Sequence, residues 1–330
     1  MRFRISEEQA DPMSDSPQRP SPSPRGQLWT IILAGGEGVR LRQLTRALHG
    51  EECPKQFAMI HGGRSLLQWT VARALRWSSP ENVVVVVAAE RETQARRQLV
   101  GQGPVDVVAQ PGNRGTGPGV LLPLARVLAR DPEARVVVLP SDHYVRDEAQ
   151  FERSIRLATL ASNDQIALIG AVPDHAETQY GWIVTGRSLG AQRGSVVNHF
   201  CEKPPAALAE RLLRQGALWN TFIMAGAARR FWALASEHLP AAASLFDRYR
   251  DMVDGPAESA VLEQVYDCMP VSDFSRDVLQ RAHGLCAVPL QECGWSDWGT
   301  PERVLESLRH RHHDDYTMLT RRLAVALLTP

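Results

Sequence analysis

Five short runs of apolar, largely β-branched residues alternate with four helical patterns in the first half of the chain. Apolar runs of this length, bounded by turn residues, are typical of strands buried on both faces of a sheet. Strands joined through helices pair in parallel, so the alternation predicts an α/β fold with a Rossmann-like, mostly parallel sheet flanked by helices. The expected strands are residues 29–34, 82–89, 105–110, 135–139 and 166–172, and the expected helices are residues 65–77, 91–100, 120–129 and 148–161.

The segments before and after this pattern differ from it in sequence. Residues 1–27 are dominated by Pro, Ser and charged residues, which cannot bury enough surface to offset chain entropy, so we expect a disordered tail. After about residue 173 the pattern becomes irregular, with helical patterns near 205–215 and 227–237. We therefore expect a mixed second half that binds a substrate.

Charge and cysteine content narrow the class of function. The chain has 37 Lys+Arg against 37 Asp+Glu, so no overall field favours a nucleic-acid or membrane partner. Its five cysteines are odd in number and none has C-x-x-C spacing, which argues against a disulfide framework and a structural zinc site. With no apolar run of membrane-spanning length and no signal-peptide pattern, we expect a cytoplasmic protein. A homodimer is compatible with the sequence.

A glycine-rich loop follows directly on the first expected strand, in "TIILAGGEGVRLRQLTRALHGEECPKQF" (residues 30–57). Gly35, Gly36 and Gly38 leave backbone N–H groups uncovered, which suits a phosphate group. A dinucleotide loop fails because Leu41 occupies the place of its third glycine, and a Walker-type loop fails because G-K-[ST] is absent. A tight strand-to-helix turn explains the glycines alone. A loop that holds a nucleoside triphosphate, with Arg40 and Lys55 on the phosphates, uses the whole segment.

Six further motifs follow in order: "QPGNRGTGPG", "LPSDHYV", "YGWI", "FCEKP", "LWNTFIM" and "GWSDWGT". Together with the glycine loop and "PKQF", they resemble the sugar-phosphate nucleotidyltransferases, and more narrowly the mannose-1-phosphate guanylyltransferases, over residues 29–300. The resemblance implies a nucleotide-diphospho-sugar transferase (GT-A-like) fold. It implies a nucleotidyltransferase domain at residues 28–300 and a C-terminal helical segment at 301–330. The sequence departs from the family's motifs at three positions: Val39 replaces a threonine, Gln43 a proline and Phe222 a glycine. These departures bear on which sugar and which base the protein would bind.

The resemblance also implies roles for individual residues. The expected activity transfers a nucleotidyl group from an NTP, with GTP favoured, to a sugar 1-phosphate, with mannose 1-phosphate favoured. The cofactor is Mg²⁺. The implied site residues are Arg40 and Lys55 for catalysis; Ala34, Gly35, Gly36, Gly38, Gln110, Asn113, Thr116 and Ser141 for the nucleotide; Gly181, Glu202, Lys203 and Asn220 for the sugar phosphate; and Asp142 and Asp297 for the metal.

The residues themselves leave several alternatives open. By spacing alone, Asp142 caps the next helix as readily as it binds a metal. Gln110 offers amide donor and acceptor groups to a base, but the glycines after it also suit a flexible turn. Glu202 and Lys203 are adjacent, so they serve one site only if the chain turns there.

Other functions compete with the expected transferase. One is a nucleotide-sugar sensor without catalytic activity, and another is a nicotinamide-dependent oxidoreductase, which rests on the glycines alone. Glucose 1-phosphate, a heptose 1-phosphate and another NTP also remain open as substrates.

Overall fold

The computed structural model describes residues 26–328 except 164, 191–192 and 310–311. The expectation of a disordered tail at residues 1–27 therefore lies, apart from Gly26 and Gln27, outside the described residues. Within the described chain, no helix is both long enough and apolar enough to cross a membrane.

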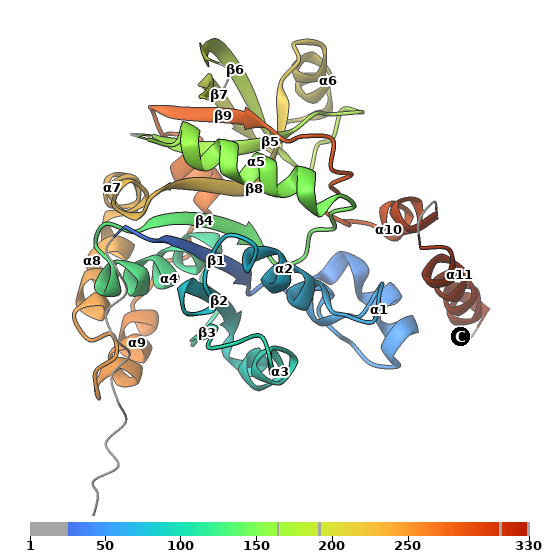
Figure 1. Cartoon of the computed structure of the whole chain (residues 1–330), viewed down its shortest axis with the longest axis horizontal. Coiled ribbons are helices and arrows are strands. Elements are labelled where there is room, and N and C mark those ends of the chain that lie inside the picture. Colours follow the sequence, from blue (N-terminus) through green and yellow to red (C-terminus); the bar gives the residue numbers. More distant parts are fainter. Residues whose placement is uncertain (1–25, 164, 191–192, 310–311, 329–330) are drawn as a thin grey trace, which may run out of the picture.

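Within the described residues, nine strands form one sheet in the order β3-β2-β1-β4-β8-β5-β9-β7-β6 (Figure 1). Strands β1 to β4 pair in parallel, as the alternation predicts, and β8 then enters antiparallel between β4 and β5. The expected α/β architecture is thus confirmed, with a mixed second half. The strands are β1 (Leu28–Ala34), β2 (Val83–Ala88), β3 (Asp106–Gln110), β4 (Arg135–Pro140), β5 (Ile166–Ala171), β6 (Gly181–Gly190), β7 (Gly194–Glu202), β8 (Leu218–Ala227) and β9 (Leu285–Pro289).

Helices cover both faces of the sheet. The α-helices are α1 (Arg42–His49), α2 (Leu66–Ala74), α3 (Glu92–Gln98), α4 (Thr116–Arg130), α5 (Glu148–Ala161), α6 (Ala206–Arg214), α7 (Ala228–His238), α8 (Pro240–Arg250), α9 (Glu258–Asp267), α10 (Pro301–Arg309) and α11 (His313–Leu328). The four helices expected in the first half and the two near 205–215 and 227–237 are present. Sequence reasoning did not identify α1, α8 and α9, nor the π-helical turn η5 (Phe274–Leu279).

The two faces follow from the alternation of side chains along a strand. On β1, Ile31 packs into the core between the sheet and α4, α7, α8 and α9, whereas Ile32 packs on the opposite face with α2 and α5. Both side chains are fully buried. Because both faces are covered, these strands consist of almost uninterrupted apolar residues.

Two helix starts are capped by their own sequence. Ser65 accepts a hydrogen bond from the backbone of Gln68, whose side chain accepts one in return from the backbone of Ser65, a capping box that starts α2. Asp147 caps α5 through the backbone N–H groups of Ala149 and Gln150. The cap of α5 is therefore Asp147 and not Asp142, which leaves the Asp142 carboxylate available to the edge of the sheet.

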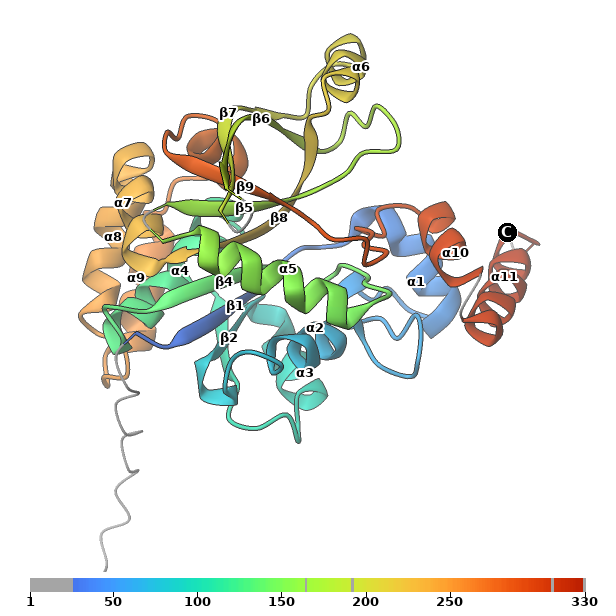
Figure 2. The same ribbon diagram turned by 45° about the horizontal axis from the view of Figure 1, so that its top comes forward.

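The last two helices form a separate layer beside α1 (Figure 2). Leu308 of α10 and Leu319 of α11 pack with Leu44 of α1 in a third apolar cluster. Helix α1 follows the glycine loop directly, so the C-terminal helices support the segment that carries the site.

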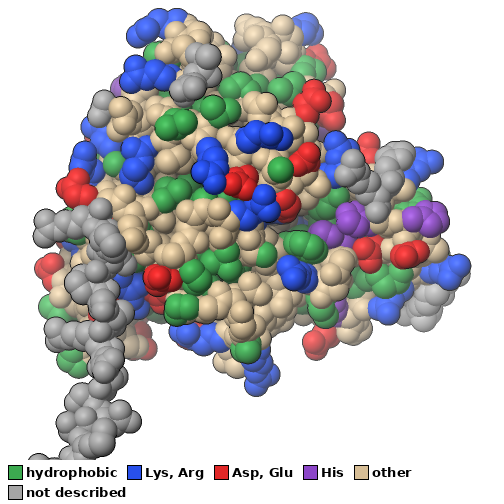
Figure 3. All heavy atoms as spheres, viewed as in Figure 1, with side chains coloured by type: hydrophobic (Ala, Val, Ile, Leu, Met, Phe, Trp, Pro, Cys, Tyr) green, Lys and Arg blue, Asp and Glu red, His purple; other side chains and the backbone are tan. Residues whose placement is uncertain are grey.

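On the face over α5, basic and acidic side chains alternate (Figure 3). Glu152 of α5, for example, pairs with both Arg76 and Arg156. This mixture is consistent with the balanced charge of the sequence.

Candidate active site

The glycine loop leaves the carboxyl end of β1 and runs close to two other segments. Gly38 has a φ of 61°, in the left-handed region that favours glycine, and a Cβ added to it would lie 2.8 Å from the backbone nitrogen of Lys55. A Cβ on Gly35 would lie 2.6 Å from Nε2 of Gln110. Gly36, in contrast, has nothing within 4 Å of where a Cβ would be. Two glycines thus allow close packing within the protein, and Gly36 leaves bare backbone beside a cavity.

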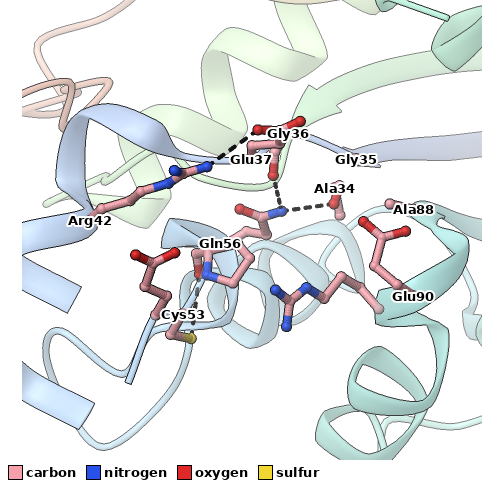
Figure 4. A pocket seen from close by; sticks show the side chains of 12 residues that line it. Ala34, Gly35, Gly36, Glu37, Arg42, Cys53, Gln56, Ala88 and Glu90 are labelled. Atoms are coloured by element: carbon pink, nitrogen blue, oxygen red, sulfur yellow. Dashed lines mark hydrogen bonds and ion pairs between the residues drawn. The ribbon is translucent and has the colours of Figure 1, made fainter. Parts of the chain in front are cut away.

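Gln56 of "PKQF" holds this loop in place. Its side-chain Nε2 donates hydrogen bonds to the carbonyl oxygens of Ala34, at 2.9 Å, and Gly36, at 2.6 Å (Figure 4). The side chain is buried, so both bonds form away from bulk water. A cavity of about 160 Å³ lies between the glycine loop, Gln56 and the end of β2.

Lys55 is a buried cation that joins three parts of the chain. Its Nζ lies 3.0 Å from Oδ2 of Asp142 and donates to the backbone carbonyls of Asp297 and of Trp298, the latter at 3.3 Å. Only 6% of the Lys55 side chain is exposed. Sequence reasoning placed this ammonium on the triphosphate. In the structure the ammonium contacts the Asp142 carboxylate and the backbone carbonyls of Asp297 and Trp298. It therefore holds the loop that carries Asp297 next to Asp142.

Asp142 follows the carboxyl end of β4. Burial favours the neutral acid, but the charge and hydrogen bond of Lys55 together with nearby His143 hold the pKa of Asp142 below its ordinary value. Beside it, burial lowers the pKa of His143 to about 4. Nδ1 of His143 accepts a hydrogen bond from Nε1 of Trp295 at 3.1 Å, so its proton sits on Nε2, which lies 4.0 Å from Asp142 Oδ1.

Asp297 lies in the tight loop before α10. Its Oδ1 accepts hydrogen bonds from the backbone of Gly299, at 2.9 Å, and from Arg303, at 3.0 Å. Its Oδ2 lies 3.6 Å from Nη2 of Arg40 in the glycine-loop segment. Burial opposes ionisation, but hydrogen bonding by Tyr180 and nearby cations hold the pKa of Asp297 below its ordinary value. The second carboxylate is therefore also ionised.

Lys55 and Asp142 line a cavity of about 240 Å³ together with the residues that directly follow Asp297, although Asp297 is not itself among the lining residues. The glycine-loop segment forms one wall, and Lys55, Asp142 and the loop after Asp297 form the other. Lys55 contacts both the Asp142 carboxylate and the Asp297 carbonyl, and Arg40 lies 3.6 Å from the Asp297 carboxylate, so these contacts bring the loop segment and the two remote aspartates together. The cavity is lined by Gly38, Val39, Arg40, Leu41, Lys55, Asp142, Trp298 and Gly299.

The loop that we expect to bind the base begins at Gln110, whose side chain lies against Gly35. Gln110 is buried at the end of β3, and its Oε1 accepts a hydrogen bond from the Tyr266 hydroxyl at 3.1 Å. Oδ1 of Asn113 accepts from the backbone of Gly115 at 3.1 Å, which shapes the turn. The hydroxyl of Thr116 accepts from the backbone of Phe274 at 2.8 Å. Thr116 thus ties this loop to the start of η5.

Ser141 has a supporting position in the structure. It is 1% exposed, its backbone nitrogen donates to the carbonyl of Leu33, and its own carbonyl accepts from the Thr70 hydroxyl. A contact between Ser141 and a nucleotide, which the resemblance implied, stays a prediction. Ser141 fixes the backbone that carries Asp142.

The residues expected for the sugar also lie together. A Cβ on Gly181 would lie 2.7 Å from Oε2 of Glu202 and 3.2 Å from Cβ of Asn220. Lys203 has a φ of 48°, so the chain turns after Glu202, and its Nζ comes 3.6 Å from Oε1 of Glu202. The turn required for Glu202 and Lys203 to serve one site is therefore present. Burial raises the pKa of Glu202.

Phe222 occupies a position that favours glycine. Its φ is 58°, and it lies where the pairing of β5 with β8 shifts register between Ile169 and Gly170. Its ring packs edge-on against Phe274, with the ring centroids 6.3 Å apart. This aromatic contact accompanies a strained backbone at the residue that departs from the family pattern.

Sequence reasoning missed Tyr266 and Arg303. Arg303, on α10, bonds to Asp297, to the Tyr180 hydroxyl and to Glu177, so it links the loop before β6 to the predicted metal carboxylate. Neither residue belongs to a motif. Only the packing of distant helices brings them to the site.

The fold and the site define an α/β protein in which Lys55 and Arg40 join the glycine-loop segment to two aspartates at the carboxyl edge of a sheet. Residues 29–313 match the family model for nucleotidyl transferases. The chain therefore belongs to the nucleotidyl transferase family, as one of its sugar-phosphate nucleotidyltransferases.

Individual relatives agree with this assignment. The xanthan biosynthesis protein XanB of Xanthomonas campestris pv. campestris is 29% identical over 88% of this chain and 62% of its own length. The mannose-1-phosphate guanylyltransferase of Escherichia coli K12 is 27% identical over 87% of this chain and 61% of its own. This chain spans about three fifths of the length of these curated relatives.

A solved structure from Thermus thermophilus, described as a mannose-1-phosphate geranyltransferase, has 28% sequence identity and a TM-score of 0.75. The match covers 87% of this chain and 81% of that one. The similarity in fold thus extends over most of both chains.

Proposed function

We propose that this protein transfers a nucleotidyl group from GTP to mannose 1-phosphate, which yields GDP-mannose and pyrophosphate. The proposal is carried by the contacts that Lys55 makes with the Asp142 carboxylate and the Asp297 carbonyl, and by the contact of Arg40 with the Asp297 carboxylate. The name of the Escherichia coli relative supports the choice of substrates.

The donor set fits a magnesium ion bound jointly with substrate. Mg²⁺ prefers oxygen ligands and commonly takes one or two carboxylates together with substrate phosphates and water. Within the described residues no group of three or more His, Cys, Asp or Glu side chains is arranged to hold a metal. Asp142 on the cavity and Asp297, directly before the lining residues Trp298 and Gly299, would suit an ion that completes its coordination with phosphate oxygens. When bound by Asp142 and Asp297, Mg²⁺ would neutralise phosphate charge.

In the proposed reaction, an oxygen of the sugar 1-phosphate attacks the α-phosphorus of the nucleotide. A new P–O bond forms as the bond to pyrophosphate breaks in line, and pyrophosphate leaves with the electron pair. The protein positions the groups and stabilises charge, without a covalent intermediate. Backbone N–H groups of the glycine loop and the guanidinium of Arg40 would face the departing pyrophosphate. Lys55 would keep Asp142 and the Asp297 loop at a fixed separation.

The second substrate would lie against the cluster of Gly181, Glu202 and Asn220. A sugar presents hydroxyl donors, which Glu202 and the Asn220 amide can accept, and Gly181 leaves room beside them. Lys203, whose side chain is 57% exposed, would reach the sugar phosphate.

The test is a matrix of NTPs against sugar 1-phosphates, scored by pyrophosphate release with Mg²⁺ present. We expect the highest kcat/KM for GTP with mannose 1-phosphate. Release with a different pair, such as glucose 1-phosphate or a heptose 1-phosphate, would keep the chemistry and change the substrates. Release with none of the pairs would contradict the proposal, and nucleotide-sugar binding that survives Asp142→Ala would then favour a sensor.

A further inference from the structure

Arg303 of α10 is a largely buried cation that bonds to three acceptors at once. Its Nη1 donates to Oδ1 of Asp297, at 3.0 Å, and to the Tyr180 hydroxyl, and its Nη2 donates to Oε2 of Glu177. The guanidinium also lies over the Tyr180 ring, with Cζ 5.1 Å from the ring centroid. Only 21% of the Arg303 side chain is exposed, against 11% for Asp297 and 14% for Glu177. One planar fork thus joins two carboxylates that are largely withdrawn from water.

These bonds give the two oxygens of the Asp297 carboxylate different surroundings. Oδ1 accepts from Arg303 and from the backbone N–H of Gly299, at 2.9 Å. Oδ2 lies 3.6 Å from Nη2 of Arg40 and close to Gly299, where a Cβ would be 2.5 Å away. Arg40 and Gly299 both line the cavity of about 240 Å³. The carboxylate is therefore held through Oδ1, and Oδ2 is left beside two residues that line the cavity.

The other end of the fork is anchored in the loop before β6. Glu177 is fixed in that loop, because its Oε1 accepts from the backbone of Gln179 and its carbonyl accepts from Nε1 of Trp182, each at 2.8 Å. Arg303 thereby joins Asp297 to the segment that begins β6, the strand whose first residue belongs to the sugar cluster. The orientation of Asp297 thus depends on a contact that no sequence motif encodes.

We propose that Arg303 is a positioning residue, which holds Asp297 with Oδ2 free for a metal ion that is bound together with the nucleotide. The inference rests on the proposed function, because it takes Asp142 and Asp297 as the carboxylates that hold Mg²⁺ against phosphate oxygens. A neighbouring cation repels Mg²⁺, so the charge of Arg303 alone would weaken metal binding. The benefit of Arg303 therefore lies in its planar geometry, which a lysine does not reproduce.

GTP binding with and without Mg²⁺ tests the proposal apart from turnover. The readout is the ratio of the Kd for GTP in excess EDTA to the Kd in Mg²⁺, and for the wild-type protein we expect Mg²⁺ to tighten binding. In Arg303→Lys the charge stays but a single nitrogen replaces the fork. We expect the ratio to fall by about tenfold, the size of one charge-assisted hydrogen bond, with the Kd in EDTA unchanged.

Two further variants complete the test. Glu177→Gln keeps the shape of the side chain and removes the charge that anchors the far side of the fork, so we expect a smaller fall in the same ratio. It carries the test if Arg303→Lys does not fold, which thermal unfolding shows. Arg309→Lys makes the same exchange at an exposed position of α10, and this control should keep the wild-type ratio.

The outcomes separate the two proposals. A wild-type or higher ratio in folded Arg303→Lys would show that the fork does not position Asp297 and would overturn the inference. Equal weakening of GTP binding with and without Mg²⁺ would show a merely structural role and would also overturn it. Wild-type protein that releases pyrophosphate but whose GTP binding does not respond to Mg²⁺ contradicts the inference alone. Wild-type protein that shows neither property contradicts the proposed function, and the inference falls with it.

Discussion

Two glycines of one loop serve different physical purposes. Gly38 is needed by the protein, because its backbone is left-handed and lies against Lys55. A side chain on Gly36 would meet no protein atom, although Gly36 lines a cavity at the site. Because Gly36 both lacks such a neighbour and lines a cavity, its backbone is open to a ligand.

Alanine substitutions should separate these purposes. We expect Gly38→Ala to lower the free energy of unfolding by roughly 1–3 kcal/mol, because the backbone is strained and Lys55 must move. We expect Gly36→Ala to leave the free energy of unfolding unchanged and to weaken GTP binding. Urea denaturation and a GTP titration measure the two effects. Equal destabilisation by both substitutions would contradict this division.

Functional side chains at the ends of strands were predictable from sequence. The residues that hold those side chains in place were not. Asp142 and Gln110 directly follow or end apolar strands, where sites of α/β sheets gather. Lys55 was identified as functional, but its burial between Asp142 and two carbonyls depends on a loop 242 residues away. Tyr266 and Arg303 lie outside every motif, so only the three-dimensional packing reveals them.

At the scale of elements, the C-terminal helices support the glycine-loop segment through α1. Arg322 of α11 donates to the carbonyl of Leu48 in α1, and Asp315 accepts from the backbone of Gly62 at 3.1 Å. Leu319 is fully buried in the same apolar cluster. Helix α1 is short, so tertiary packing rather than intrinsic propensity accounts for its stability.

Shortening the side chain of Leu319 should therefore change ligand binding at the site. We expect Leu319→Ala to lower the free energy of unfolding by about 2–5 kcal/mol, through lost burial and a cavity. We also expect a lower affinity for GTP as α1 loosens. Arg321→Ala, on the exposed face of the same helix, is the control and should change neither quantity. A Leu319→Ala variant with wild-type stability would show that α11 does not support α1.

The first-half elements were predictable because continuous apolar runs admit few alternatives. The order of the second half was not, since β8 enters antiparallel between β4 and β5 and no local pattern encodes that choice. Helices α8 and α9 contain Ala, Ser and charged residues without a strong apolar run. The hydrogen bond from Tyr266 of α9 to Gln110 depends on tertiary contacts alone.

At the scale of the whole molecule, one aromatic cluster joins distant parts of the chain. The ring of His61 stacks on Trp69, with ring centroids 5.1 Å apart, and contacts Tyr144, Trp298 and His312. Burial, followed by the charges of His312 and Arg73, lowers the pKa of His61 to about 4. The folded protein therefore resists protonation of this ring.

This pKa predicts a fall in stability on acidification. Between about pH 6.5 and pH 4 the unfolded chain binds a proton at His61 that the folded chain does not, so the free energy of unfolding decreases as pH is lowered. Once the pH is well below both pKa values, the loss in free energy of unfolding that His61 causes is roughly 3 kcal/mol. His143 acts with the same sign.

His61→Phe isolates the share of His61. The substitution also removes a buried Nδ1 without a partner, so the variant should be folded at neutral pH. We expect its free energy of unfolding to change less between about pH 6.5 and pH 4.5 than that of the wild-type protein. Identical pH profiles would show that His61 is not held neutral by the fold.

We propose that two aspartates far apart in the chain, Asp142 and Asp297, act in one phosphate site. If so, removal of either carboxylate should disable the same step. A double-mutant cycle measures this directly, since groups that act as a unit give losses that do not add.

The decisive measurement is kcat/KM for Mg²⁺-dependent pyrophosphate release from GTP and mannose 1-phosphate by Asp142→Asn, Asp297→Asn and the double variant. We expect each single variant to lose about 10²- to 10³-fold, and the double variant to lose little more than the less active single variant. Folding of each variant is checked by thermal unfolding. Folded single variants that retain full activity, or losses that multiply in the double variant, would contradict a shared site.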